Sequence, residues 1–345
     1  MKRALPEVSM TMTVITLLAV CIAMDARAGQ ADGGDTWPIQ LAMNDGTQLG
    51  PILSYDVITN DFSHDDHIFL DKSTSMLNRV GFYVRKPGVY DVEIYYSRLM
   101  KKWRDVYLKL DSSSIFPIDA GSVRLGQGKV PLGFERNTSS TQTSFIEYSL
   151  PSQAIYEHRR VGVQWSVVQR YWLAEVGYFG NNIEGTNPGY TWAWHVALVP
   201  VNDAGEVVHL GASGSWEYPS GSADSEGVYQ PPDASFKVAP AAILTSVGLI
   251  NSGALVGADE IRREGFEGLW INGPFSLQSE YLEADTSFCC GERDYDIHGY
   301  YLFGSWVLSG ESRGYSEGSV ENVQPAQTLG ALELVLRYST LNLND

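Results

Sequence analysis

Apolar and polar residues alternate with a period of two along most of the chain. In residues 79–85, for example, Val80, Phe82 and Val84 share one side of an extended segment, and polar or small residues occupy the other. Such alternation is typical of strands whose two faces meet different surroundings. The same pattern predicts strands at 90–98, 104–110, 122–128, 160–166, 171–179, 191–200, 206–216, 236–249, 264–272, 275–284, 295–308 and 330–338. With turn residues between these segments and no long helical pattern, the sequence predicts an all-β antiparallel fold of about 13 strands.

Alternation alone fits a secreted or surface β-sandwich without a pore as well as a transmembrane β-barrel. Two features favour the barrel. Aromatic residues gather toward the strand ends, where a membrane barrel has its interfacial girdles. The faces opposite the apolar ones carry charge in mid-strand, which a wide barrel can place around water. The aromatic residues in question are Tyr90, Trp103, Trp165, Trp172, Trp192, Trp194, Trp270 and Trp306.

Composition narrows the class of protein. The 345 residues include 41 acidic and 24 basic ones, a net charge of −17, and this argues against nucleic acid as a partner. Residues 1–28 carry a basic start, an apolar run at 14–23 and a small-residue site at 26–28, which predicts a secretory signal peptide. The remaining domain, 29–345, has no apolar stretch near the ~20 residues that a membrane helix needs. The chain is therefore exported, and it is either soluble or crosses a membrane with strands.

The basic residues are concentrated in one part of the chain. Residues 71–170 hold 15 basic and 9 acidic residues, whereas the rest of 29–345 holds 6 basic and 30 acidic ones. If the aliphatic faces meet lipid, the cations opposite them point into the lumen, because a cation facing mid-bilayer lipid costs ~2–4 kcal/mol. A lumen lined with cations lowers the barrier for anions. The alternative is ordinary solvated strand charge, paired with Asp91, Glu93 and Asp105. The cations that share a face are Arg79, Arg85, Lys109, Arg124 and Arg160.

The segment at about 129–150 does not alternate cleanly and contains a cluster of hydroxyl residues at 138–144. In a barrel, a loop of this length can fold inward and narrow the pore. Lys129, Arg136 and the hydroxyls would then offer hydrogen-bond donors to an oxyanion. In the alternative, the segment is an exposed loop.

Several motifs in this part of the chain and beyond it occur together in one order. Residues 126–135 read GQGKVPLGFE, 138–140 TSS, 147–151 EYSLP and 159–164 RRVGVQ. Downstream, 273–281 read GPFSLQSEY, 299–301 GYY, 308–313 LSGESR and 330–339 GALELVLRYS. This series resembles the phosphate-selective porin O and P family over about residues 76–344.

The resemblance implies a bacterial outer-membrane barrel of 16 antiparallel strands that touches membrane lipid and assembles as a homotrimer. It also implies passage of phosphate or polyphosphate through a lumen lined by Arg and Lys, with a constriction made by an infolded loop. Lys129 and Arg160 lie in motif-matched positions. With about 13 candidate strands before Asp345, the chain is expected to be an incomplete version of such a barrel, because single-chain bacterial barrels have even strand numbers.

Other residue groups point to no chemistry. The run His64 to His67 has metal-ligand residue types, but four adjacent residues cannot all face one ion, so an acidic loop is expected rather than a metal site. Cys289 and Cys290 form a vicinal disulfide or have no special role. No catalytic motif occurs, so we expect neither an enzyme nor a cofactor. The expected function is an outer-membrane porin for passive diffusion of small anions, with a pore-free β-sandwich or a non-conducting truncated porin as alternatives.

Overall fold

The computed structural model describes residues 41–60, 72–116, 118–224, 226–238, 250–289, 294–328 and 330–343. The predicted signal peptide, the segment from His64 to His67, and Cys290 lie outside these residues. None of the helices in the described part of the chain is long and apolar enough to cross a membrane.

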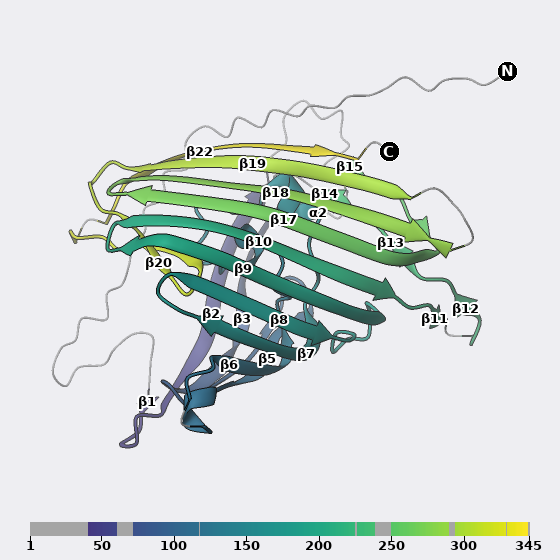
Figure 1. Ribbon diagram of the computed structural model, residues 1–345, viewed down its shortest axis with the longest axis horizontal. Coiled ribbons are helices and arrows are strands. Elements are labelled where there is room, and N and C mark those ends of the chain that lie inside the picture. Colours follow the sequence, from purple (N-terminus) through teal and green to yellow (C-terminus); the bar gives the residue numbers. More distant parts are fainter. Residues whose placement is uncertain are drawn as a thin grey trace.

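The described residues form one antiparallel sheet of 14 strands, which confirms the all-β prediction. The sheet curls strongly, so that β2 and β3 lie behind the front strands β8 to β10 in Figure 1. Sequence neighbours pair along the sheet, and β1 and β22 stand at the two ends of its order. The strands are β1 (Leu41–Ala42), β2 (Gln48–Asn60), β3 (Lys72–Lys86), β4 (Tyr90–Ser97), β5 (Lys102–Asp111), β6 (Ser122–Gly128), β7 (Arg160–Val168), β8 (Trp172–Phe179), β9 (Gly189–Asp203), β10 (Glu206–Pro219), β17 (Ala258–Asn272), β18 (Phe275–Phe288), β19 (Tyr295–Val307) and β22 (Glu333–Asn342).

Smaller elements decorate this sheet. Four two-stranded pairs join β11 (Ser222–Ala223) to β12 (Tyr229–Gln230), β13 (Asp233–Ala234) to β16 (Leu255–Val256), β14 (Lys237–Val238) to β15 (Ile250–Asn251), and β20 (Arg313–Ser316) to β21 (Ser319–Val323). The described helices are short: η1 (Ser112–Ser114), α1 (Phe134–Asn137) and α2 (Leu150–Ala154). Because all the long strands belong to one continuous sheet, the two-layer sandwich considered from the sequence does not apply.

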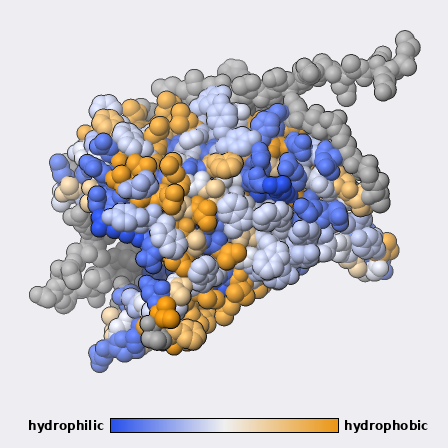
Figure 2. Space-filling model, viewed as in Figure 1, coloured by the Kyte–Doolittle hydropathy of each residue, from blue (hydrophilic) through white to orange (hydrophobic). Residues whose placement is uncertain are grey.

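The two faces of the large sheet differ in burial as the alternation predicts. On β7, Val161, Val163 and Trp165 are exposed, while Arg160 and Gln164 are buried on the opposite face. The exposed face, called the outer face here, carries Leu198 at 64% and Leu336 at 61% exposure. Figure 2 shows orange apolar residues spread across it. A soluble protein rarely exposes contiguous apolar surface on this scale, so this face suits contact with hydrocarbon.

The opposite face, called the inner face, is filled by residues from outside the large sheet. Leu150, Ala154 and Ile155 of α2 and its flank pack against Leu282 of β18 and Ile297 of β19. A second cluster joins Phe134 of α1 to Val199, Val207, Leu269, Ile271 and Val320. The interior therefore receives the segment between β6 and β7 and the β20–β21 pair.

Candidate functional site

A row of charged residues runs across the inner face from β3 to β6. Strand pairing places Arg85 opposite Asp91, Asp91 opposite Lys109, and Lys109 opposite Arg124. Directly opposed residues on neighbouring strands have Cβ atoms about 5 Å apart, so these side chains form a continuous line. We call Arg85, Lys109 and Arg124 the basic row. These three cations, with Asp91 between Arg85 and Lys109, lie on the face that is turned away from the apolar one.

The contacts of the basic row leave much of its charge unneutralised. Arg85 Nε lies 3.7 Å from Asp91 Oδ1, and its guanidinium lies over the Tyr83 ring. Arg124 donates to Gln164 Oε1 at 2.5 Å and to the carbonyl oxygen of Lys129, both neutral acceptors. Among the residues that the structure describes, Asp91 is the one acidic group that forms an ion pair with the row.

The segment 129–159, called the crossing loop here, spans the inner face to reach distant strands. The backbone N–H of Gly133 donates to Ser213 Oγ of β10 at 3.0 Å, and that of Phe134 donates to Glu280 Oε1 of β18 at 2.8 Å. Gly133 has φ +75°, and a Cβ there would lie 2.7 Å from Glu280 Oε1, so this close approach requires glycine.

A carboxylate fastens the far side of the crossing loop. Glu135 Oε2 accepts hydrogen bonds from the N–H and the hydroxyl of Ser149 at 2.9 and 2.7 Å. Its Oε1 accepts from Arg337 Nη1 of β22 at 3.1 Å. Arg313 of β20 also donates to Ser144 Oγ in the same loop. The loop is thereby tied to β22, at the opposite end of the sheet order, and to β20 of the separate β20–β21 pair.

The three predicted cations on or near the crossing loop have distinct surroundings. Arg79 of β3 donates to Ser140 Oγ in the loop and lies over the Tyr95 ring. Lys129 Nζ donates to the carbonyl oxygens of Asn137 and Thr138 at 3.2 and 2.8 Å. Burial, reinforced by the charge of nearby Arg159, lowers the pKa of Lys129 to about 7. The amine is thus held to backbone oxygens instead of facing open solvent.

Arg136 is held by aromatic rings. Its guanidinium lies 4.3 Å from the ring centroid of Tyr148 and 3.8 Å from that of Tyr156. Both distances are within the range of a cation–π contact. This stacking leaves the edge of the guanidinium, where its N–H donors are, available to other groups.

Arg160 is enclosed in a buried ion cluster with Glu157, Glu217 and Arg263. It is 1% exposed, lies 3.3 Å from Glu157 Oε2, and also pairs with Glu217. Arg263 contacts the same two carboxylates at 3.0 and 2.8 Å. With two guanidinium groups matched by two carboxylates, the cluster fits a structural tie between β7, β10 and β17 better than an anion contact.

Sequence reasoning missed a second basic region beside the crossing loop. Arg159 forms a two-point ion pair with Asp105 at 2.9 Å, and it lines a cavity of about 340 Å³ with Arg104 and Lys102. Glu184 is an acidic residue on the same cavity wall. The two adjacent arginines Arg159 and Arg160 could have indicated this region in the sequence. Strand alternation, however, placed only Arg160 on the inner face.

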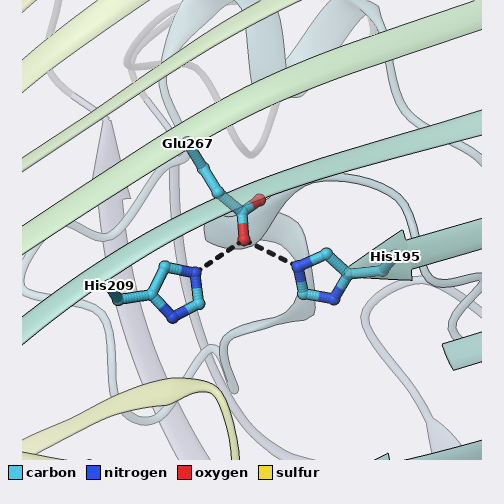
Figure 3. Close-up of side chains that lie close together, drawn as sticks. All are labelled: His195, His209 and Glu267. Carbon is cyan, nitrogen blue, oxygen red and sulfur yellow. Dashed lines mark hydrogen bonds and ion pairs between the residues drawn. The ribbon is translucent and has the colours of Figure 1, made fainter. Parts of the chain in front are cut away.

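A second group that sequence reasoning missed consists of His195, His209 and Glu267. These residues lie on the inner faces of β9, β10 and β17, and one oxygen of Glu267 joins both imidazole rings (Figure 3). The distances are 2.7 Å from His195 Nε2 and 2.9 Å from His209 Nε2 to Glu267 Oε1. All three side chains are almost fully buried. The three residues are far apart in the sequence, so no local motif reveals the group. The period-two alternation does place each of the three side chains on the inner face.

Comparison with known sequences gives a family match over most of the chain. A sequence model described as phosphate-selective porin O and P matches residues 90–345. Porin O of Pseudomonas aeruginosa is 39% identical over 88 residues, covering 24% of this chain and 19% of that protein. An uncharacterized protein of Caulobacter vibrioides is 25% identical over 224 residues, covering 60% of this chain and 44% of that one. The matched segments thus span less than half of either relative.

Solved outer-membrane structures resemble the chain more distantly. An anion-selective porin from Comamonas acidovorans aligns with a TM-score of 0.46 at 11% identity, covering 86% of this chain and 99% of that one. OmpT of Vibrio cholerae aligns with a TM-score of 0.44 at 10% identity, covering 87% and 99%.

Proposed function

Because the chain belongs to the phosphate-selective porin O and P family and lies in the bacterial outer membrane, we propose that it passes small anions, phosphate foremost. The path follows the inner face of the sheet. The basic row carries this proposal, because it places three cations on one line of the face opposite the apolar surface.

Passage of this kind needs no covalent step. A cation ~5 Å from a monovalent anion contributes about 0.8 kcal/mol even at the dielectric constant of water. Guanidinium groups suit phosphate because their planar donors pair with two oxygens at once. Asp91 offsets one charge of the basic row, which keeps the attraction weak enough for an anion to leave.

The crossing loop supports a narrowing of the same path. It brings Ser140 to Arg79 and holds Arg136 between two tyrosine rings on the interior side. In our proposal these donors meet an anion after the cavity beside Arg104 and Arg159 has collected it. The pore-lining roles of Arg79, Arg85, Lys109, Arg124, Lys129 and Arg136 belong to this proposal, as does the homotrimer implied by the family resemblance.

A charge reversal in the basic row tests the proposal. Lys109→Glu changes the charge by two units, worth about 1.7 kcal/mol at ~5 Å in water and about 1 kcal/mol after screening at 0.1 M salt. The change disfavours an anion and favours a cation by about 1 kcal/mol each, so we expect the anion-to-cation permeability ratio to fall about thirtyfold, measured as the reversal potential in a planar bilayer under a salt gradient. The shift should shrink in 1 M salt, because the screening length there is only about 3 Å.

Arg262→Glu is the matched control, since Arg262 is exposed on the outer-face side of β17. It carries the same charge change and should leave the reversal potential unaltered. Phosphate added to the wild-type channel should reduce the chloride current. Absence of conduction, or equal effects of the two substitutions, would contradict the proposal.

A further inference from the structure

His195, His209 and Glu267, called the His–Glu cluster here, bring three potential metal ligands together from three neighbouring strands. Their ligand atoms all lie within 4.8 Å of one another. Figure 3 shows the carboxylate of Glu267 between the two rings, with a nitrogen of each ring turned toward it. We propose that this cluster binds one divalent transition-metal ion, with Zn²⁺ as the best match.

The donor set has the chemistry that Zn²⁺ prefers. Two imidazole nitrogens and one carboxylate form a ligand set that occurs in protein zinc sites, with a fourth position left for water or another ligand. Mg²⁺ and Ca²⁺ prefer oxygen ligands, so two imidazoles select against them. Tetrahedral ligands with bonds of about 2.0 Å stand about 3.3 Å apart. The 2.7 and 2.9 Å separations therefore need to widen by about half an ångström.

The outer nitrogen of each imidazole also has a partner. His195 Nδ1 lies 3.2 Å from Glu175 Oε2, and His209 Nδ1 lies 2.7 Å from the hydroxyl of Tyr315. Metal-binding histidines generally use their second nitrogen in this way, because the bond fixes the ring and the tautomer that leaves Nε2 free to bind. The three ligand residues are typical of a metal site, and the hydrogen bonds of the two Nδ1 atoms are typical of one too.

One oxygen of Glu267 gives an independent reason to expect a ligand. Glu267 Oε2 is buried and has no hydrogen-bond partner among the described residues, while the whole side chain is 1% exposed. A buried carboxylate oxygen without a partner is unfavourable, and a metal ion would satisfy it. The space for this carboxylate is provided by Gly211 of β10, where a Cβ would lie 2.4 Å from Glu267 Oε1.

The charge of the surroundings matches a divalent ion. Glu267 and Glu175 supply two negative charges, and the two imidazoles bind as neutral ligands. A divalent ion therefore gives the buried group no net charge, which is the condition under which buried charge is tolerated. The proposal goes beyond anion passage and does not depend on it.

Zinc binding to the full chain tests the proposal. The protein is purified without a histidine tag, folded in detergent, stripped with a chelator and titrated with Zn²⁺ alone in a calorimeter. We expect one equivalent to bind, and His209→Ala and Glu267→Gln to weaken the affinity at least tenfold. His298→Ala is the matched control, since His298 is exposed on the outer face of β19, and it should bind as the wild type does. Failure of the wild type to bind one equivalent, or unchanged affinity in the ligand variants, would overturn the proposal.

Two further variants keep the test valid if ligand variants fail to fold. Glu175→Gln and Tyr315→Phe leave the three ligands in place and alter the partners of Nδ1, and Glu175 also accepts hydrogen bonds from Gln164 and Ser166. Loss of Nδ1 partners typically weakens metal binding 10- to 100-fold. Folding is checked by heat-modifiable gel migration, and Co²⁺ absorption spectra report whether imidazole is bound. Folded variants with wild-type affinity and spectra would count against the site. Because binding is measured without current, this outcome is separable from failure of the anion path.

Discussion

The attachment of the crossing loop to β22 gives a sharp prediction about the channel interior. In Glu135→Ala, the N–H of Ser149 loses its acceptor, its hydroxyl keeps only Ser152 Oγ, and Arg337 loses its carboxylate partner. Arg337 retains the carbonyl oxygens of Glu147 and Tyr148 at 2.8 and 3.3 Å, so its charge is only partly compensated. The loop should detach locally while the strands stay paired.

The magnitude follows from the burial of these groups. The side chains of Glu135 and Arg337 are 9% and 16% exposed, close to the buried regime. Breaking a buried ion pair by removing one partner costs about 3–5 kcal/mol. This pair is not completely buried, so we take the lower value of about 3 kcal/mol for the free energy lost from loop attachment. A loss of this size raises the detached fraction of the loop roughly a hundredfold.

Hydrogen exchange followed by mass spectrometry measures this change. Peptides covering residues 133–155 should exchange much faster in Glu135→Ala, whereas strand peptides should be unaltered, and single-channel conductance should increase. Ile146→Ala serves as the control, because Ile146 is 85% exposed on the same loop. Unchanged protection of residues 133–155, together with wild-type conductance, would refute this account of how the loop is held.

Two further predictions concern single cations. Since the pKa of Lys129 lies at about 7, its positive charge is present below that pH and is lost above it, so anion selectivity should fall between pH 6 and pH 8. Lys129→Arg should remove this dependence, and reversal potentials at the two pH values decide the matter. Arg160→Ala should destabilise the fold by about 3–5 kcal/mol, since it leaves buried carboxylates without compensation. The control is Arg170→Ala, which removes an exposed ion pair with Asp203 and should lower the free energy of unfolding by less than about 1 kcal/mol. Denaturant unfolding in detergent measures the stability of both variants.

Alternation predicted most long strands because lipid and interior select different side chains on the two faces. The strand expected at 160–166 is β7 at Arg160–Val168, and the one expected at 79–85 is the second half of β3. The strand β2 was missed: Gly50 and Pro51 resemble a turn, and a register shift between Ser54 and Tyr55 interrupts the alternation. Of the strand expected at 236–249, the described part forms only the short β14.

Alternation assigns a strand cation to one face of the sheet, but it does not show what that cation contacts. Arg160 looks like a free interior charge until its partner Glu217, 57 residues away, is brought beside it. The His–Glu cluster joins residues separated by 58 and 72 positions, which no local pattern reveals. Alternation encodes the direction of a side chain, whereas register across many strands decides its neighbours.

The long reach of the crossing loop imposes an order on assembly. Glu135 and Arg337 are 202 residues apart, and Phe134 and Glu280 are 146 apart. The loop leaves β6 early in the chain, and although Arg79 of β3 and Ser213 of β10 also contact it, its partners Glu280 and Arg337 arrive only with β18 and β22. Closing so large a span is entropically costly until the intervening strands have paired. The attachments to Glu280 and Arg337 can therefore form only after β18 and β22 have joined the sheet, so full docking of the loop follows the pairing of these strands.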